Sequence, residues 1–207
     1  LVKTNRKTIS QSTVERIILA GFGGQGVLFL GKVLAETGMH AGKHVSWIPS
    51  YGPEMRGGTA NCTVILSENE IASPMVTVPD SVIAMNRPSV AKFNVRIKAG
   101  GMLMYNSSLI ERQEFRDDIR LVEIPASEIA EEIGSPRVAN LVVAGAYAKF
   151  SKLFTYEDLI AAMPSLMPGS KKEMLEVNLQ AIEKGFNYVE EKKYMFGRYV
   201  YSVFKGI

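Results

Sequence analysis

Six consecutive residues, Gly21-Phe22-Gly23-Gly24-Gln25-Gly26, carry the clearest chemical pattern in the sequence. Gly21, Gly23 and Gly26 follow the G-x-G-x-x-G spacing of phosphate-binding turns. In that pattern the first glycine permits a tight turn, the second lets the backbone approach a ligand, and the third allows close helix–strand packing. The spacing therefore predicts a site in which main-chain amides bind a phosphate or another anion.

The segments on either side of these glycines support that prediction. The apolar run Glu15–Ala20 is typical of a buried parallel strand, and Val27–Ala41 has apolar residues at helical spacing. A helix that starts at this point directs its free amides and the positive end of its dipole at the loop. The plainer alternative is a tight turn that packs well and binds nothing.

A second unusual loop, Pro49–Gly58, follows the strand expected at Lys43–Ile48 and reads Pro-Ser-Tyr-Gly-Pro-Glu-Met-Arg-Gly-Gly. Loops at the carboxyl ends of parallel strands line the ligand crevice, and we expect this strand to lie beside the first one. Arg56 offers a planar fork for phosphate or carboxylate, and Glu54 lies close to it in sequence. Gly57 and Gly58 let the backbone approach a ligand or a partner chain. The alternative is a surface loop with a local Glu–Arg pair.

Three polar residues near other element ends are weaker candidates. Asn86 and Arg87 follow the strand expected at Ser81–Met85, so they should lie at the same edge of the sheet. Asn140 lies at the start of a predicted helix, Val138–Phe150. For each of these residues, helix capping or a turn is the simpler interpretation.

The sequence lacks the residues that an NAD site, a disulfide or a metal site would need. An NAD site needs an Asp or Glu at the end of the second strand, where this sequence has Ser46-Trp47-Ile48-Pro49. The chain has one cysteine, Cys62, which cannot form an internal disulfide, a thiolate zinc site or an iron–sulfur site alone. Its strand-like surroundings favour a buried structural thiol. We predict no catalytic residue and no metal ligand on this chain.

The order of elements predicts an α/β fold. Strands and helices alternate as far as residue 124, and the remainder is mostly helical. We expect a Rossmann-like open, mostly parallel sheet with flanking helices and a helical C-terminal part. Residues 14–192 would form a single domain, after a flexible arm or vector remnant at 1–13. The β-prone tail 193–207 either pairs with a sheet edge or a partner, or is disordered.

Composition and charge argue against a membrane protein, a secreted protein and a nucleic-acid-binding protein. Hydrophobic residues make up 46% and charged residues 22%, as in ordinary globular proteins. No apolar stretch is long enough for a membrane span and the first residues do not resemble a secretory signal, so we expect a cytoplasmic protein. The net charge of +3 comes from scattered basic residues, which argues against nucleic-acid binding.

Several segments together resemble one family. They are Gly-Phe-Gly-Gly-Gln-Gly, Ser-Tyr-Gly-Pro-Glu-Met-Arg-Gly-Gly, Asp80–Pro88, Gly-Gly-Met-Leu-Met-Tyr-Asn-Ser-Ser-Leu, and Asn-Leu-Val-Val-Ala-Gly-Ala from Asn140. Over about Glu15–Glu190 the chain resembles the gamma subunit of 2-oxoacid:ferredoxin oxidoreductases.

The resemblance implies a subunit without a complete active site of its own. Such enzymes decarboxylate a 2-oxoacid on thiamine diphosphate, pass electrons through iron–sulfur clusters to ferredoxin, and release an acyl-CoA. The resemblance places thiamine diphosphate on alpha and beta subunits and the clusters on other chains, such as a delta subunit. It implies that the gamma chain contributes to the CoA side of the site or to subunit docking, without binding a cofactor tightly. The residues concerned are Gly21, Phe22, Gly23, Gly24, Gln25, Gly26, Tyr51, Glu54, Arg56, Gly57, Gly58 and Asn86.

Two alternatives remain at this point. One is a stand-alone Rossmann-type oxidoreductase with NAD or FAD, which the missing ribose carboxylate argues against. The other is a scaffold module without a ligand. A subunit should bury a large partner surface, for which the predicted helix Ser170–Lys192 and the tail are candidates, and the isolated chain could form a homodimer through it. The resemblance implies that other subunits select the 2-oxoacid.

Overall fold

The structure is a computed structural model that describes residues 13–50, 59–111, 115–167, 169, 172–191, 194–196 and 199–201. Its strands are β1 (Val14–Phe22), β2 (His44–Ser50), β3 (Thr59–Ser67), β4 (Ser81–Ala84), β5 (Met102–Asn106), β6 (Arg120–Ile124), β7 (Tyr194–Phe196) and β8 (Tyr199–Tyr201). Its α-helices are α1 (Val27–His40), α2 (Arg87–Phe93), α3 (Ala126–Glu132), α4 (Ala139–Ala148), α5 (Tyr156–Leu166) and α6 (Lys172–Glu191). Two short 3-10 helices are η1 (Asn94–Arg96) and η2 (Pro136–Val138).

The predicted α/β fold is confirmed, but the sheet is mixed and not mostly parallel. The strand order is β2-β3-β1-β4-β5-β6-β7-β8. The pairs β1–β4, β4–β5 and β5–β6 are parallel, whereas β1–β3, β2–β3, β6–β7 and β7–β8 are antiparallel. The alternation of elements predicted the parallel centre correctly. It did not show that both flanks of the sheet would be antiparallel.

Strand β3 separates β2 from β1, so the expectation that β2 would lie beside β1 is wrong. The chain leaves β2 and returns antiparallel as β3, which then pairs along the whole of β1 from Val14↔Ser67 to Phe22↔Thr59. Because β3 runs antiparallel to both neighbours, β1 and β2 still run in the same direction. Their carboxyl ends therefore still share one edge of the sheet.

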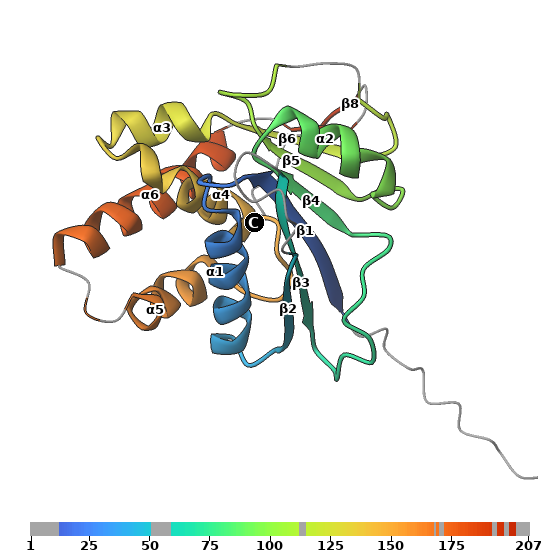
Figure 1. Cartoon of the computed structure of the whole chain (residues 1–207), viewed down its shortest axis with the longest axis horizontal. Coiled ribbons are helices and arrows are strands. Elements are labelled where there is room, and N and C mark those ends of the chain that lie inside the picture. Colours follow the sequence, from blue (N-terminus) through green and yellow to red (C-terminus); the bar gives the residue numbers. More distant parts are fainter. Residues whose placement is uncertain are drawn as a thin grey trace, which may run out of the picture.

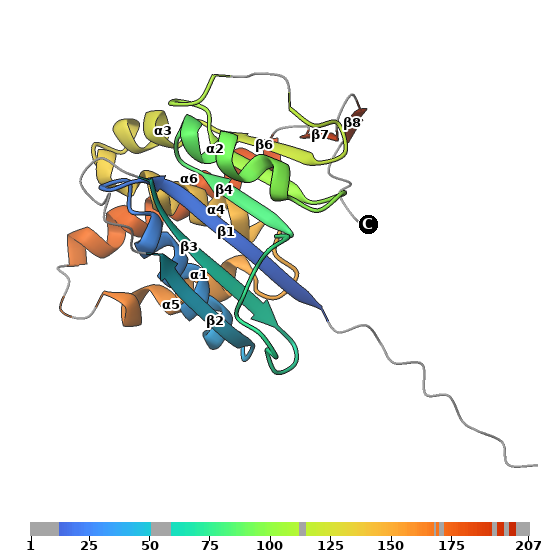
Figure 2. The ribbon, with the colours of Figure 1, turned by 45° about the vertical axis from the view of Figure 1, so that its right-hand side comes forward.

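Helices cover the two faces of the sheet unequally (Figures 1 and 2). Helices α1, α3, α4, α5 and α6 contribute to one hydrophobic core, and α2 with the segment after it contributes to a second core on the opposite face. Residues along β1 alternate between the two: Ile17 and Leu19 face the first core, and Ile18 and Ala20 face the second. Burial on both faces explains why this strand is a continuous apolar run in the sequence.

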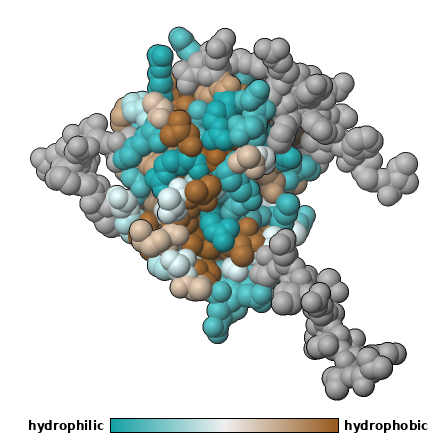
Figure 3. Space-filling view, turned by 90° about the vertical axis from the view of Figure 1, so that its right-hand side faces the viewer, coloured by the Kyte–Doolittle hydropathy of each residue, from teal (hydrophilic) through white to brown (hydrophobic). Residues whose placement is uncertain are grey.

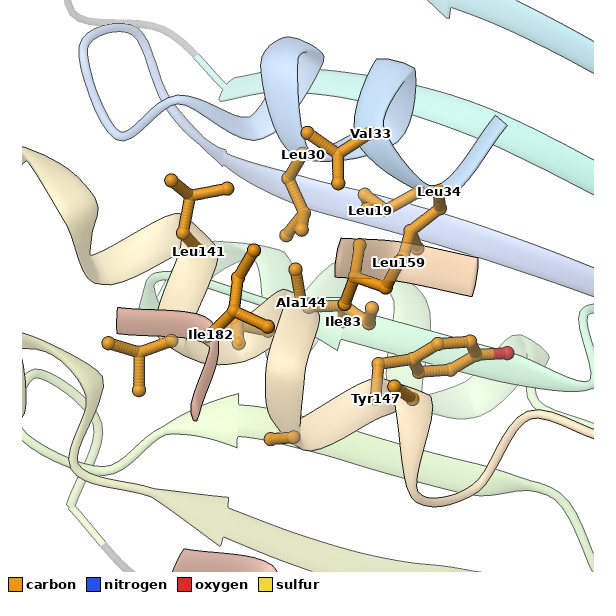
Figure 4. Close-up of a cluster of buried hydrophobic side chains, with 14 of the residues drawn as sticks. Leu19, Leu30, Val33, Leu34, Ile83, Leu141, Ala144, Tyr147, Leu159 and Ile182 are labelled. Atoms are coloured by element: carbon orange, nitrogen blue, oxygen red, sulfur yellow. The ribbon is translucent and has the colours of Figure 1, made fainter. Parts of the chain in front are cut away.

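The larger core forms where α1, α4, α5 and α6 meet the sheet. Figure 4 shows side chains from these helices converging on Leu19 of β1 and Ile83 of β4. They include Leu30 and Leu34 from α1, Ala144 and Tyr147 from α4, Leu159 from α5, and Ile182 from α6. This core fixes α1 against the strand that precedes the glycine-rich loop.

Several element ends differ from the prediction. The strand expected at Lys43–Ile48 spans His44–Ser50, and the strand expected at Ser81–Met85 ends at Ala84. The helix expected from Val138 begins at Ala139, after η2. In the tail, β7 pairs with β6 at Arg120↔Phe196, which agrees with the sheet-edge alternative. Within the described ranges, no helix has both the length and the apolar character that crossing a bilayer requires.

The surface opposite the larger core is mixed in character. In Figure 3 groups of hydrophobic residues lie between hydrophilic ones on the face turned toward the viewer. The large apolar side chains that are exposed on the described part of the chain include Met75, Val78 and Val95. Met75, Val78 and Val95 are not aromatic, and exposed residues of this kind that occur singly are common on monomeric proteins.

Candidate functional site

The glycine-rich loop joins β1 to α1 at the carboxyl edge of the parallel strands. Helix α1 follows β1 onto one face of the sheet, and α2 follows β4 onto the other, so the connections diverge between these two neighbouring strands. Such a divergence is the usual position of a ligand crevice in open α/β sheets. The predicted loop therefore lies where the fold favours a binding site.

Each glycine of the motif has a distinct environment. A Cβ added at Gly21 would lie 2.6 Å from Val27 Cγ2 and 2.9 Å from Met85 Cβ, so this position has no room for a side chain. Gly24 and Gly26 have φ angles of 97° and 70°, which residues other than glycine rarely adopt. Gly23 and Gly24 are exposed, so their backbone can approach a bound group.

The side chain of Gln25 closes the loop internally. Its Oε1 accepts a hydrogen bond from Phe22 N at 2.6 Å, and its Nε2 donates to Met85 O at 2.9 Å. Gln25 therefore ties the loop after β1 to the end of β4. Since both ends of this amide bond the main chain, the structure shows a supporting role for Gln25 instead of a free side chain.

Asn86 lies beside this loop, as predicted, and also caps a helix. Its Oδ1 accepts from Ser89 N at 2.9 Å, which makes it the N-cap of α2. Its Nδ2 donates to Gln25 Oε1 at 3.5 Å. Asn86 is 3% exposed. Its two hydrogen bonds join α2 to the glycine-rich loop.

The first turn of α1 provides the anion-attracting element. Gly26 is the N-cap and supplies no capping side chain, while its carbonyl accepts the first helical bond from Leu30 N at 2.8 Å. The amides of Val27, Leu28 and Phe29, which come before Leu30 in this turn, thus have no bond to a capping side chain. With the dipole of a 14-residue helix behind them, such amides favour a negatively charged group.

The second predicted loop begins and ends at the same edge. Residues 51–58 lie outside the described residues, and with them Tyr51, Glu54, Arg56, Gly57 and Gly58. The residues that flank the loop are placed: Thr59 pairs with Phe22, and Ser50 pairs with Asn61. The chain therefore enters and leaves this loop within the same part of the sheet edge as the glycine-rich loop.

Asn140 is a further residue at the site, and its capping interpretation was wrong. It is the second residue of α4, whose N-cap is Val138 without a side-chain bond. Its Nδ2 donates instead to Gly26 O at 3.2 Å, across 114 positions of sequence. One sequence signal was available: a single asparagine within the otherwise apolar run Ala-Asn-Leu-Val-Val-Ala, where a buried amide needs a partner.

The cysteine packs against the start of α1 and is shielded from solvent. Cys62 is 0% exposed, and its Sγ lies 3.6 Å from Val27 O at the start of α1. Burial raises the pKa of the Cys62 thiol to about 12, against weaker opposing effects from Trp47 and Gly31. This confirms the prediction of a buried structural thiol. Among the residues that the structure describes, no cluster of His, Cys, Asp and Glu side chains could hold a metal ion.

Comparison with known proteins settles the family. A model of the pyruvate ferredoxin/flavodoxin oxidoreductase family matches residues 16–188, most of the chain. The chain belongs to this family. The resemblance inferred from its motifs is therefore confirmed.

Sequence relatives within the pyruvate ferredoxin/flavodoxin oxidoreductase family fall into two length classes. The ketoisovalerate oxidoreductase subunit VorA of Methanothermobacter marburgensis is 34% identical over 85% of this chain and 37% of the relative. The chain thus spans about a third of the length of that relative. The 2-oxoglutarate synthase subunit KorC of Methanocaldococcus jannaschii is 32% identical over 86% of this chain and 95% of the relative.

Solved structures from the family share the fold. The gamma subunit of a keto/oxoacid ferredoxin oxidoreductase from Geobacter sulfurreducens has a TM-score of 0.74 and 26% identity, and covers 86% of this chain and 99% of its own. A 2-oxoglutarate:ferredoxin oxidoreductase from Magnetococcus marinus, solved with 2-oxoglutarate, coenzyme A and succinyl-CoA bound, has a TM-score of 0.80 and 25% identity. The match covers 86% of this chain and 31% of that one.

Proposed function

We propose that this chain is the gamma-type subunit of a 2-oxoacid:ferredoxin oxidoreductase and contributes its glycine-rich loop to the CoA side of the assembled site. The whole enzyme would decarboxylate a 2-oxoacid, reduce ferredoxin and release an acyl-CoA. Its alpha, beta and delta subunits would be the partners of this chain, and ferredoxin would bind the complex in the cytoplasm. Family membership supports the subunit role.

The observation that carries the CoA proposal is the open first turn of α1 beside exposed Gly23 and Gly24. CoA has phosphate groups, and backbone amides at a helix N-terminus bind phosphates well. Gly21 and Gln25 keep this turn compact through contacts with the end of β4. The Magnetococcus relative, solved with CoA, is consistent with CoA as the ligand class of the complex.

Electron transfer belongs to other chains in this proposal. An iron–sulfur cluster is held by several cysteines, and this sequence has one, which is fully buried. The chain therefore does not fit a cluster. Thiamine diphosphate, which supplies the decarboxylation chemistry, is likewise assigned to the partner subunits. This chain would bind and orient CoA without performing a bond-breaking step.

One observation favours docking as a second function of the same loop. Phe22, the second residue of the motif, is 39% exposed although it is a large aromatic side chain. Exposed aromatic residues are enriched at protein interfaces. The loop would in that case contact a partner subunit, with or without CoA.

Replacement of Arg56 in the assembled complex tests these proposals. Arg56→Ala should raise the KM for CoA by about tenfold, because a bond from arginine to a charged phosphate contributes about 1.5–3 kcal/mol. Lys43→Ala is the matched control, since it removes one positive charge at the opposite end of β2. An unchanged KM with loss of subunit assembly would instead support docking. Purification of the tagged chain from its host should also recover thiamine-diphosphate-binding and cluster-bearing chains.

A further inference from the structure

Asn140 of α4 contacts the peptide at which the glycine-rich loop becomes a helix. The Gly26 carbonyl accepts from Leu30 N at 2.8 Å within α1 and from Asn140 Nδ2 at 3.2 Å. A carbonyl oxygen has two lone pairs and can accept both bonds. Asn140 therefore bonds the first helical peptide of α1 itself, and not a neighbouring segment.

The shapes of Gly26 and Asn140 are also complementary. A Cβ added at Gly26 would lie 2.4 Å from Asn140 Nδ2 and 2.9 Å from Cγ. The amide of Asn140 thus occupies the space in which any side chain at position 26 would lie. Gly26 is needed for this contact as well as for its φ angle of 70°.

Helix α4 holds Asn140 on a rigid support. Asn140 is 5% exposed, and every residue of α4 from 140 to 148 is buried. Beyond its far end, Glu15 of β1 accepts hydrogen bonds from Ser151 Oγ at 2.9 Å and from Lys152 N. Helix α4 is therefore bonded at both ends to the unit formed by β1 and the glycine-rich loop.

Gln25 and Asn140 act on opposite ends of the loop. Gln25 fixes its start through Phe22 N and Met85 O, and Asn140 fixes its end through Gly26 O. Gly23 and Gly24 lie between these anchors and remain exposed. The direction of the first-turn amides of α1 depends on where the peptide of Gly26 is held.

We infer that Asn140 is a positioning residue, which holds the amide end of α1 in the orientation that binds the anionic ligand. This inference rests on the proposed function for its ligand, the phosphates of CoA. Asn140 acts through Gly26 and the α1 amides and takes no part in the reaction. Its loss should weaken ligand binding while the chemical step proceeds normally.

Asn178 offers a matched control. It is 7% exposed, and its Nδ2 donates to Met167 Sδ at 2.8 Å. Asn140 and Asn178 both line one 450 Å³ groove between α1, α4 and α6. Asn178→Leu and Asn140→Leu thus make the same change at equally buried positions, but only Asn140 bonds the loop.

The test combines steady-state kinetics of the assembled complex with amide hydrogen exchange of this chain within it. Asn140→Leu should raise the KM for CoA by about tenfold, as expected for the loss of one buried hydrogen bond that orients the site, with kcat within about twofold. Exchange at residues 22–29 should become faster. Asn140→Asp, which replaces the donor by an acceptor facing the Gly26 carbonyl, should have at least the effect of Asn140→Leu. Asn178→Leu should leave both readouts unchanged.

The outcomes separate this inference from the proposed function. If Arg56→Ala raises the KM for CoA and Asn140→Leu changes neither KM nor exchange at 22–29, the positioning inference is overturned and the proposed function stands. If no variant changes the KM but Asn140→Leu alone accelerates exchange at 22–29, Asn140 positions the loop and CoA is the wrong ligand. If Asn140→Leu and Asn178→Leu accelerate exchange equally, both variants act by destabilising the protein in general, and the inference is overturned.

Discussion

Gly145 of α4 and Gly185 of α6 face each other's helix backbone at the crossing of these two helices. A Cβ at Gly145 would lie 1.9 Å from Ile182 O, and a Cβ at Gly185 would lie 1.9 Å from Val142 O. The contact is thus reciprocal: each glycine meets the residue three positions before the other. Such small residues let helix backbones approach more closely than side chains would permit, and here they seat α6 against the helix that carries Asn140.

Replacement of either glycine should destabilise the protein. Alanine in an open helix position stabilises by up to about 1 kcal/mol relative to glycine. At this crossing the methyl group would meet a backbone carbonyl that cannot rotate away, so Gly145→Ala and Gly185→Ala should each lower the free energy of unfolding by about 3 kcal/mol or more. Urea denaturation of each variant and of the wild type measures this loss of unfolding free energy.

Gly38→Ala provides the comparison for these two variants. A Cβ at Gly38 of α1 would lie 2.5 Å from Leu66 Cδ2, the end of a flexible side chain, so its cost should be clearly smaller. Stabilities of Gly145→Ala and Gly185→Ala equal to that of the wild type would mean that α4 and α6 do not cross as described.

Cys62 should resist alkylation in the folded protein. With a pKa of about 12, only about one thiol in ten thousand is ionised at pH 8, and the side chain is fully buried. Labelling by iodoacetamide should therefore occur only through unfolding and should accelerate across the urea transition. Rapid labelling of the native chain at low urea concentration would show that Cys62 is reached without unfolding, against the packing described.

The sequence predicted most elements because their signals are local. The apolar run of β1, the glycines at Gly21–Gly26 and the apolar spacing of α1 each indicate their own structure within a few residues. The proximity of Asn86 to the glycine-rich loop followed from the rule that parallel strands end at one edge. These inferences needed no knowledge of distant contacts.

The errors concern relationships between distant segments. Nothing within β3 indicates that it pairs with β1 over nine positions and displaces β2 from that place, because an apolar strand can pair on either side and in either direction. The bond from Asn140 to Gly26 spans 114 positions and depends on how α4 packs on the sheet. Local patterns contain neither fact, so Asn140 was assigned to its own helix end.

Gly24 and Gly26 should respond differently to alanine. Both have positive φ, so each replacement introduces backbone strain of about 1–2 kcal/mol. A Cβ at Gly24 has nothing within 4 Å, whereas one at Gly26 meets the Asn140 amide. Gly26→Ala should therefore lower the free energy of unfolding by about 1 kcal/mol more than Gly24→Ala does.

A double-mutant cycle isolates the contact between positions 26 and 140. In an Asn140→Ala background the methyl group introduced at position 26 has room, so Gly26→Ala should cost less there than in the wild type. Additive effects in chemical denaturation would mean that the two residues do not compete for the same space.

Glu15 should give the protein a distinctive pH dependence. Burial raises the pKa of the Glu15 carboxyl above its usual 4.5, against the hydrogen bonds from Lys152 N, Ser151 and Tyr147, while the charge of Asp80 raises it further. Between pH 4.5 and this raised pKa, the folded state binds more protons at Glu15 than the unfolded state does. The contribution of Glu15 to the free energy of unfolding must therefore fall as pH rises through that range and stay constant above it.

Two variants test this assignment by urea denaturation at a series of pH values. Glu15→Gln cannot titrate, so its stability relative to the wild type should increase with pH across that range and then level off. Tyr147→Phe removes the hydroxyl that lies 3.3 Å from Glu15 Oε2 and whose hydrogen bond lowers the pKa of Glu15. In this variant the range should extend to higher pH. If Glu15→Gln retains the pH slope of the wild type, another group causes it, because the variant has no carboxyl at position 15 to protonate.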